Sequence, residues 1–472
     1  MKIYDKLYID GQWISGHCGE MINVIDPATE QVAGRAVLAD HIDVDRAVYA
    51  ARRAFDSWSR TSSEERAAYI SRIAEQLIKR GDEMVQTISV EMGAPLAFCK
   101  AVQVEDPIEA LKKHAERTVM LEHEQSIGNA TVVREPVGVC GFINPWNYPL
   151  HQMIGKVAPA LAAGCTMVVK PSEATPLHAF LLAEAIDAAG LPPGVFNLVN
   201  GSGPDVGEPL CVHPEVDMIS FTGSTRAGVR IAQLAAPSVK RVCQELGGKS
   251  PFLICEDADL DAAVRLGVED VMLNSGQTCT ALTRMLIPQS RYEDAVAIAK
   301  THAESLKVGN PSDDATVVGP MSSKAQMNVV RLYIETGLAE GARLVTGGLE
   351  SPKGMNQGYY IQPTIFADVT NEMTIAREEI FGPVLCMIPY RDEAQAIAIA
   401  NDTPYGLSAR VWSEDKQHAE SLARKIRAGQ VYINDGFWNN DVPFGGYKQS
   451  GNGRELGNLG VEEFFETKAL IR

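Results

Sequence analysis

The sequence predicts an α/β fold in which helices cover both faces of mostly parallel sheets. Short apolar runs alternate with helical stretches between Val137 and Gln244. Runs that are apolar on both faces and separated by helices are typical of a doubly wound unit, which binds ligands at the carboxyl ends of its strands. The expected strands are Val137–Ile143, Thr166–Val169, Val195–Val199, Asp217–Phe221 and Arg241–Gln244, and the expected helices are Leu150–Ala163, Pro176–Ala189 and Arg226–Ala236.

A second alternating region indicates a second α/β domain. It begins at Pro251–Ile254 and continues through Leu260–Leu273, Met285–Ile287 and beyond Val384. A chain of 472 residues is also too long for one ordinary core, so two or three domains are expected.

Two helices are expected upstream of these regions. Ser62 and Glu65 have capping-box spacing at the start of an amphipathic stretch, and another helix is expected over Asp82–Val90. The segment from Glu105 to Glu135 breaks the pattern and is expected to form a small extra element or a subunit contact.

Composition excludes several classes of function. The net charge is −17 and no Lys/Arg-rich run occurs, which argues against a nucleic-acid or anionic-membrane partner. The nine cysteines are odd in number and contain no Cys-x-x-Cys, so neither a disulfide framework nor a metal site is expected. No apolar leader or membrane-spanning run is evident, and we expect a cytoplasmic protein with reduced thiols.

Glycine-rich segments indicate where a phosphate could bind. Gly201–Gly207 comes close to the dinucleotide fingerprint, but its third glycine falls one position late. Gly223–Gly228 follows an expected strand and precedes a helix, which presents backbone N–H groups and the Ser224 hydroxyl to an anion.

One cysteine and one carboxylate stand out as candidate catalytic groups. Cys279 lies in the Ser/Gly/Thr-rich segment Asn274–Thr280, and Glu245 opens the glycine-rich segment Glu245–Lys249. A thiol of this kind with a nearby carboxylate is typical of covalent catalysis. Taken alone, the pair suits a hydrolase or an acyltransferase as well as an oxidising enzyme.

Seven segments together resemble the NAD(P)-dependent aldehyde dehydrogenase superfamily, and the resemblance spans nearly the whole chain. They are Pro145–Pro149, Lys170–Glu173, Phe221–Ser224, Glu245–Lys249, Gly276–Cys279, Glu378–Pro383 and Pro443–Lys448.

The resemblance implies three catalytic residues. Cys279 would attack an aldehyde carbonyl to form a thiohemiacetal, and Asn147 would stabilise the oxyanion together with the Cys279 backbone N–H. Glu245 would activate the water that hydrolyses the later thioester. Relatives that transfer the acyl group to coenzyme A generally lack this carboxylate, so its presence favours hydrolysis.

The resemblance also implies a cofactor site. Lys170 and Glu173 would grip the adenosine ribose, and a carboxylate there favours NAD and leaves NADP as the alternative. The other implied cofactor residues are Ser224 and Gly223 at the pyrophosphate, and Trp146, Glu379 and Phe381 near the nicotinamide and its ribose.

The sequence identifies the substrate-binding and proton-transfer residues less specifically than the catalytic and cofactor residues. Lys156 and Glu455 resemble a secondary proton-relay pair, with a surface salt bridge as the alternative. The substrate tunnel is expected to involve Tyr148, Gln152 and Phe437–Asp441, including Trp438, with no arginine to bind a substrate carboxylate.

The expected organisation has three parts. Residues 1–117 and 137–247 would form the dinucleotide-binding domain, 248–455 the catalytic domain, and 118–136 with 456–472 an oligomerisation element of a homodimer or homotetramer. The activity expected is NAD-dependent oxidation of an aldehyde to a carboxylic acid. The alternatives are a coenzyme A-acylating semialdehyde dehydrogenase and a catalytically silent binding or structural protein with the same fold.

Overall fold

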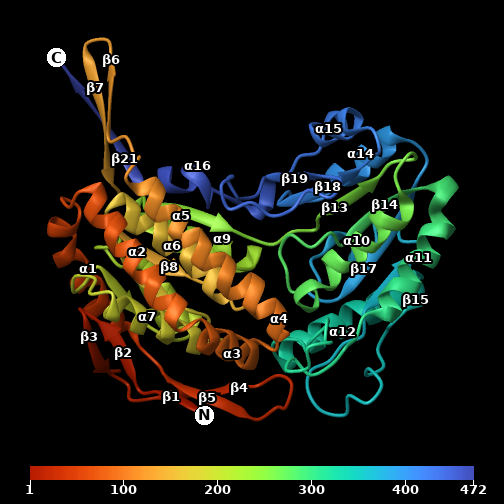
Figure 1. The fold of residues 1–472 in the computed structure, drawn as a ribbon, viewed down its shortest axis with the longest axis horizontal. Helices are drawn as coiled ribbons and strands as arrows, with labels where there is room; N and C mark the ends of the chain where they lie inside the picture. Colours follow the sequence, from red (N-terminus) through yellow and green to blue (C-terminus); the bar gives the residue numbers. More distant parts are fainter.

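The computed structural model describes all residues from Met1 to Arg472. Two large sheets dominate the molecule, and helices lie on both faces of each (Figure 1). The eight-stranded sheet has the order β20-β12-β11-β8-β9-β10-β2-β3, and the seven-stranded sheet has the order β15-β16-β17-β14-β13-β18-β19. The α/β fold class expected from the sequence is therefore confirmed.

The eight-stranded sheet has a parallel centre with antiparallel edges. Its strands are β2 (Lys6–Ile9), β3 (Gln12–Ser15), β8 (Val139–Ile143), β9 (Thr166–Lys170), β10 (Phe196–Leu198), β11 (Met218–Thr222), β12 (Arg241–Glu245) and β20 (Gly451–Asn452). The five strands from β8 to β12 are parallel to their neighbours, whereas β2, β3 and β20 are antiparallel. The parallel strands overlap the five apolar runs because both of their faces are buried.

The seven-stranded sheet is buried on both faces too. Its strands are β13 (Pro251–Ile254), β14 (Arg284–Pro288), β15 (Arg343–Thr346), β16 (Thr364–Ala367), β17 (Val384–Tyr390), β18 (Ser408–Trp412) and β19 (Gln430–Ile433). Alternate residues enter different cores: Leu253 and Leu286 pack on one side, and Phe252 and Met285 pack on the other. Only the edge strand β15 is antiparallel.

Helices connect and cover the strands. The longer ones are α1 (His41–Trp58), α2 (Ser63–Lys79), α3 (Gly81–Met92), α5 (Asp106–Thr118), α6 (Pro149–Ala163), α7 (Leu177–Ala188), α9 (Thr225–Ala235), α10 (Leu260–Met272), α11 (Tyr292–Ser305) and α12 (Lys324–Ala339). The shorter ones are α4 (Leu96–Phe98), α8 (Glu208–Val212), α13 (Thr374–Arg377), α14 (Glu393–Asn401), α15 (Lys416–Ala423) and α16 (Gly457–Glu462). Tight 3-10 or wide π turns are η1 (Cys99–Glu105), η2 (Gly203–Gly207), η3 (Ala236–Ser238), η4 (Leu273–Gly276), η5 (Gln289–Arg291) and η6 (Lys448–Ser450).

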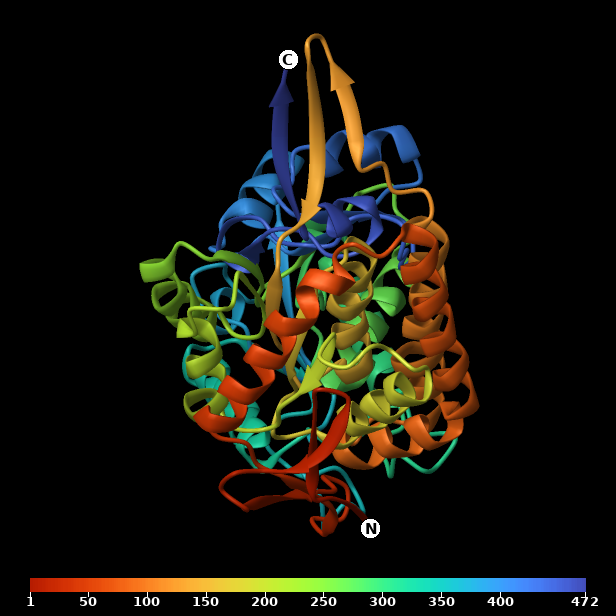
Figure 2. The same cartoon turned by 90° about the vertical axis from the view of Figure 1, so that its left-hand side faces the viewer.

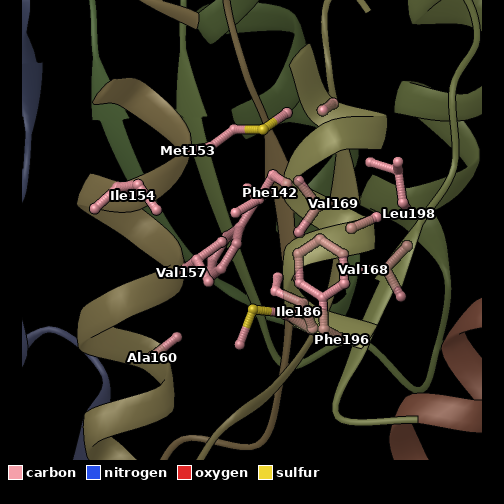
Figure 3. Packing of buried hydrophobic residues seen from close by; sticks show 14 of the residues in the cluster. Phe142, Met153, Ile154, Val157, Ala160, Val168, Val169, Ile186, Phe196 and Leu198 are labelled. Carbon is pink, nitrogen blue, oxygen red and sulfur yellow. The ribbon is translucent and has the colours of Figure 1, made fainter. Parts of the chain in front are cut away.

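Helix α6 lies at the centre of the first core. Met153 and Val157 of this helix pack against Phe142 of β8 and the neighbouring strands (Figure 3). Nearly every residue of α6 is buried, including two polar ones, Gln152 and Lys156. Burying a lysine is unfavourable unless its ammonium is paired, so this position is a candidate for a functional group.

The sequence pattern did not predict the strands and the helix before Ser62, and it did not predict one later helix. The first 58 residues form β1 (Lys2–Tyr4), β4 (Met21–Ile25), β5 (Val32–Val37), the β2–β3 hairpin and α1. The expected break after Glu105 is wrong in its first part, because Asp106–Thr118 is helix α5. The preceding π turn η1 shifts the apolar residues out of the regular helical period, which explains why the pattern fails there.

A three-stranded sheet projects from the body of the molecule. Its order is β21-β7-β6, with β6 (Glu124–Ile127), β7 (Ala130–Pro136) and β21 (Phe465–Ile471), and the C-terminus lies near its tip (Figure 2). Arg241 fastens its base by donating to the carbonyl oxygens of Glu463 (2.7 Å) and Phe465 (2.8 Å). None of the helices combines the length and apolar character that a membrane crossing requires.

The two large sheets meet where β12 leads into β13. Glu245 ends β12 and Pro251 begins β13, so the carboxyl edge of the first sheet lies next to the amino edge of the second. Strand β20 returns from the second half of the chain and pairs with the end of β12. This junction gathers loops from both sheets and positions the candidate site.

Candidate active site

The candidate residues of the first half all follow parallel strands. Asn147 follows β8, Lys170 ends β9, Ser224 follows β11 and Glu245 ends β12. Strands β9 and β10 lie on one side of β8, and the next two strands in the chain, β11 and β12, lie on its other side. The strand order therefore reverses at β8. Parallel sheets bind ligands in the crevice at such a reversal.

Two glycines allow the loop that carries Cys279 to approach its neighbours. Asn274 (φ 52°), Ser275 (φ 57°) and Gly276 (φ 75°) are consecutive left-handed residues before the cysteine. A Cβ atom at Gly276 would lie 2.0 Å from the carbonyl of Gly382, and one at Gly248 would lie 2.5 Å from the carbonyl oxygen of Cys279. Side chains at these positions would separate the loops, so both glycines are required for the site to close.

Hydrogen bonds fix Asn147 beside this loop. Its side-chain Nδ2 donates to the carbonyl oxygen of Gln277 at 2.9 Å. The backbone carbonyl oxygen of Asn147 accepts hydrogen bonds from Gln103 Nε2 (2.9 Å) and Asn274 Nδ2 (3.0 Å). A primary amide carries two N–H donors, so the second is available to an oxyanion formed near Cys279.

Glu245, Lys156 and Glu455 form a buried charged cluster. Lys156 Nζ lies 2.8 Å from Glu455 Oε1 and donates to Thr222 Oγ1 at 2.7 Å. The Lys156 side chain is 1% exposed, so the alternative of a surface salt bridge is wrong. Glu245 is 4% exposed, and its Oε2 has no hydrogen-bond partner in the protein.

This cluster raises the pKa of Glu245. Burial is the largest cause and the nearby Glu455 carboxylate is the next, while Lys156 acts in the opposite direction. A buried carboxyl with a raised pKa and an unpartnered oxygen is typical of a group that accepts and releases a proton during a reaction.

The thiol of Cys279 is stabilised in its protonated form. Burial raises its pKa well above the ordinary value, and the carboxylates of Glu379 and Glu245 raise it further. The sulfur is therefore not a resting thiolate in this arrangement. Its attack on a carbonyl requires that a base take up the thiol proton.

Residues expected to hold a dinucleotide lie along the same edge. Lys170 Nζ forms an ion pair with Glu173 at 3.2 Å, and burial lowers the pKa of Lys170. The Ser224 hydroxyl caps helix α9 by accepting from the Ala227 amide at 3.3 Å, which leaves the amides of Thr225 and Arg226 without an intrahelical acceptor. Free amides at a helix start fit a pyrophosphate, and a carboxylate at the end of β9 fits a ribose diol.

The far end of the dinucleotide site is shared by both halves of the chain. Trp146 and Phe381 make an edge-to-face contact with ring centroids 5.4 Å apart. Glu379 Oε1 accepts from the Gly248 amide at 3.0 Å, and burial raises the pKa of Glu379 to about 7. Phe381 has a φ of 56°, a rare conformation that directs this loop toward Trp146.

A cavity of about 520 Å³ leads to Cys279. All four residues expected at the substrate, Tyr148, Gln152, Phe437 and Trp438, line it. Sequence reasoning missed further lining residues: Asp106, His151, Asp270, Arg410 and Tyr432. One of them, Arg410, is an arginine from outside the expected tunnel segment.

The end of the expected tunnel segment has a different role. Asn440 donates to Asp106 Oδ1 at 2.8 Å and accepts from Trp438 Nε1 at 2.7 Å. Asp441 forms ion pairs with Lys113 and Arg117 on α5. These two residues do not line the cavity and instead fasten the loop that carries Trp438 to helix α5.

A cluster of possible metal ligands lies outside the cavity, where no metal was expected. Ligand atoms of Cys255, Glu393 and His418 lie within 4.8 Å of one another. His418 Nε2 and Glu393 Oε1 already bond each other at 2.6 Å, which accounts for their proximity. Cys255, Glu393 and His418 are far apart in the sequence, so they do not show the short, regular spacing that is typical of metal-binding motifs.

The glycine of the cysteine loop gives a testable consequence for stability. We expect Gly276→Ala to lower the free energy of unfolding by about 1–3 kcal/mol more than Gly190→Ala, measured by urea denaturation. Both glycines have left-handed backbones (φ 75° and 70°), but a Cβ at Gly190 meets nothing within 4 Å. Equal losses for the two variants would contradict the required close approach to Gly382.

Comparison with solved structures identifies close structural relatives. A mutant of aldehyde dehydrogenase C from Pseudomonas syringae, in complex with NAD+ and octanal, superposes with a TM-score of 0.98 at 50% identity, over 99% of this chain and 96% of that one. An aldehyde dehydrogenase from Mycobacterium tuberculosis complexed with NAD+ gives a TM-score of 0.97 at 43% identity, over 100% of this chain and 98% of that one.

Sequence comparison agrees over the full chain. A 3-succinoylsemialdehyde-pyridine dehydrogenase from a Pseudomonas species is 50% identical over 477 residues, covering 100% of this chain and 99% of the relative. The model of the aldehyde dehydrogenase family matches residues 13–470. The chain therefore belongs to the aldehyde dehydrogenase family, and it catalyses NAD-dependent oxidation of an aldehyde.

Proposed function

We propose that Cys279 is the nucleophile of this oxidation and that the product is released by hydrolysis with Glu245 as general base. The observation that carries the proposal is the position of Cys279 in the wall of the cavity, with the buried carboxyl of Glu245 near enough to raise the pKa of its thiol. The substrate class we favour is a medium-sized aldehyde, since a relative binds octanal and another is named for a pyridine semialdehyde.

The first step forms a bond between sulfur and the aldehyde carbon. The Cys279 thiol gives its proton to water in the cavity, its sulfur attacks the carbonyl carbon, and the carbonyl oxygen becomes an oxyanion. The free N–H of Asn147 and the Cys279 amide stabilise that charge. Bound NAD+ supplies the acceptor for the hydride that the resulting thiohemiacetal loses, which leaves a thioester on Cys279.

The second step hydrolyses the thioester. Glu245 takes a proton from water as the water attacks the acyl carbon, and the bond to sulfur breaks. The carboxylic acid leaves, and the sulfur of Cys279 takes up a proton to return to the thiol. The proton on Glu245 needs an exit, and Glu455 and Lys156 are ionisable groups close enough to act on its charge. Lys156 Nζ lies 2.8 Å from Glu455 Oε1 and 2.7 Å from Thr222 Oγ1. We propose that this pair carries the proton away from Glu245.

Cofactor contacts follow the same geometry. Glu173, next to Lys170, would accept hydrogen bonds from the ribose hydroxyls and repel a 2′-phosphate, which supports a preference for NAD over NADP. The amides after Gly223 and the Ser224 turn would receive the pyrophosphate. Trp146, Glu379 and Phe381 would hold the nicotinamide end of the cofactor close to Cys279.

The rival functions fit the site less well. Transfer of the acyl group to coenzyme A does not need a buried base, whereas Glu245 is held ready beside the cysteine. A silent binding protein would have no reason to keep a buried carboxyl unpartnered at this position. We also propose that the chain forms a homodimer or homotetramer through the projecting sheet. We propose a dinucleotide-binding domain at 1–117 and 137–247, a catalytic domain at 248–455, and an oligomerisation element at 118–136 and 456–472. The nine free thiols suit a cytoplasmic location, which we propose as well.

Replacement of the base separates the two steps. Glu245→Gln should still form about one NADH per site in a rapid burst with octanal and then slow by at least about 100-fold, because the amide cannot take a proton from water. Stopped-flow absorbance of NADH measures both phases. Cys279→Ala is the control and should give no burst while still binding NAD+. If Glu245→Gln loses even the first turnover, its carboxylate acts before hydride transfer.

The buried carboxylates also predict the pH dependence. Because the pKa of Glu245 is raised, the base is lost as pH falls through that pKa, and steady-state turnover falls with it. Glu455→Gln removes a neighbouring negative charge, so the pKa of Glu245 should fall and the acidic limb of the kcat profile should move to lower pH. An unchanged limb, or one moved to higher pH, would show that Glu455 does not act on Glu245.

A further inference from the structure

The loop that carries Cys279 is fixed at the cysteine itself by a single side-chain hydrogen bond. Ahead of the cysteine, Gln277 Oε1 accepts from the Ser322 amide at 2.8 Å. Across the three residues centred on the cysteine, the one side-chain hydrogen bond joins Thr278 Oγ1 to Tyr148 Oη at 2.8 Å. Tyr148 is therefore the side chain that holds this part of the loop against the rest of the site.

Tyr148 and its neighbour Asn147 bond two consecutive residues of the cysteine loop. Asn147 Nδ2 donates to the carbonyl oxygen of Gln277 at 2.9 Å, and Tyr148 bonds the next residue along the chain, Thr278. The second side-chain N–H of Asn147 and the backbone N–H of Cys279 are the two proposed oxyanion donors. Because one donor belongs to each segment, the paired bonds set the spacing between the donors.

The backbone before the cysteine needs this support. Asn274 and Ser275 both have left-handed backbones, with φ values of 52° and 57°, and neither is a glycine. Residues other than glycine keep this conformation only where the surrounding contacts hold them in it. Removal of a hydrogen bond lets such a loop relax, and Cys279 then moves relative to Asn147.

The ring and the hydroxyl of Tyr148 have separate roles. The ring lines the cavity together with Cys279 and packs edge-to-face on Phe98, with ring centroids 6.0 Å apart. The hydroxyl bonds Thr278, and burial raises the pKa of Tyr148 well above its ordinary value, so the hydroxyl keeps its proton and is not a base for the thiol. Removal of the hydroxyl alone leaves the aromatic wall in place and deletes the bond to the loop.

We infer that Tyr148 is a positioning residue whose hydroxyl, through its hydrogen bond to Thr278, holds Cys279 at the separation from Asn147 that the oxyanion requires. Loss of the bond slows formation of the thiohemiacetal and the hydride transfer that follows, because a small displacement of a reacting group lowers its rate strongly. The aldehyde still binds, since the cavity wall is unchanged. This inference rests on the proposed roles of Cys279 and Asn147.

The test measures NADH formation in a single turnover, with the enzyme in excess over octanal and with saturating NAD+. Stopped-flow absorbance at increasing enzyme concentration gives a maximal rate constant and a half-saturating concentration. Tyr148→Phe and Thr278→Val each remove one hydroxyl and nearly keep the size of the side chain. We expect each variant to lower the maximal rate constant by about tenfold or more and to change the half-saturating concentration by less than about twofold.

Further variants link the loss to the bond itself. The double variant Tyr148→Phe with Thr278→Val should be no slower than the slower single variant, because both changes remove the same bond. Thr278→Ser keeps a hydroxyl and should stay within about twofold of the wild type. Tyr390→Phe is the matched control: Tyr390 is buried outside the cavity and donates to the carbonyl oxygen of Ile254 at 2.8 Å, so its loss should lower the thermal stability and leave the rate constant unchanged. Thermal unfolding checks that each variant is folded.

Several outcomes would overturn the inference. They are an unchanged maximal rate constant in folded Tyr148→Phe or Thr278→Val, losses that multiply in the double variant, an equal loss in Tyr390→Phe, and a change confined to the half-saturating concentration, which would mean that the hydroxyl binds the aldehyde. Because the two single variants remove opposite ends of one bond, either folded variant is a sufficient test. NADH formation by the wild type and its absence in Cys279→Ala would leave the proposed function intact in those cases. No NADH from the wild type, or NADH from Cys279→Ala, would instead refute the proposed function itself.

Discussion

The site depends on the close approach of three backbone segments that lack side chains where they meet. Gly276 lies against Gly382, Gly248 lies against the carbonyl of Cys279, and a Cβ atom at Gly445 would lie 2.7 Å from Glu245 Oε1. The contacts of Gly248 and Gly445 join loops of the two large sheets, whereas Gly276 and Gly382 both lie in loops of the seven-stranded sheet. Cys279, Glu245 and the proposed dinucleotide edge can converge only because these positions are glycine.

Burial then gives the converged groups their chemistry. Full burial of Glu245 and partial burial of Glu379 and Cys279 raise the pKa of each group, which favours the protonated forms of the acids and the thiol. A carboxyl group with a raised pKa, such as Glu245, exchanges its proton at higher pH than an exposed carboxyl group does. Lys156 and Arg454 limit the rise in the pKa of Glu245 because both add positive charge near it.

Much of the fold and site could be predicted from the sequence. The parallel strands are readable because residues such as Val139 and Met167 are apolar and both faces of the sheet are buried. The β2–β3 hairpin also has a sequence signal, because Asp10-Gly11 is a typical two-residue hairpin turn, and both residues have positive φ in the structure. Helix α5 was hidden by a π turn that disturbs the apolar period.

The substrate cavity could not be predicted in the same way. Arg410 lies in a short apolar strand, and nothing in its neighbours tells whether its side chain faces the cavity or the opposite core. Asp106 and Asp270 are far apart in sequence and meet the same cavity only through tertiary packing. Contacts of this kind depend on the path of the whole chain, whereas the proposed catalytic residues belong to short local motifs.

The most direct measurement of the central claim is the mass of the enzyme trapped between its two steps. Glu245→Gln, mixed briefly with NAD+ and octanal and then quenched in acid, should carry one oxidised acyl group, and peptide mapping should place it on Cys279. The adduct should be absent without NAD+. An adduct on another cysteine, or none at all after NADH has formed, would contradict a thioester at Cys279 that waits for Glu245 to activate water.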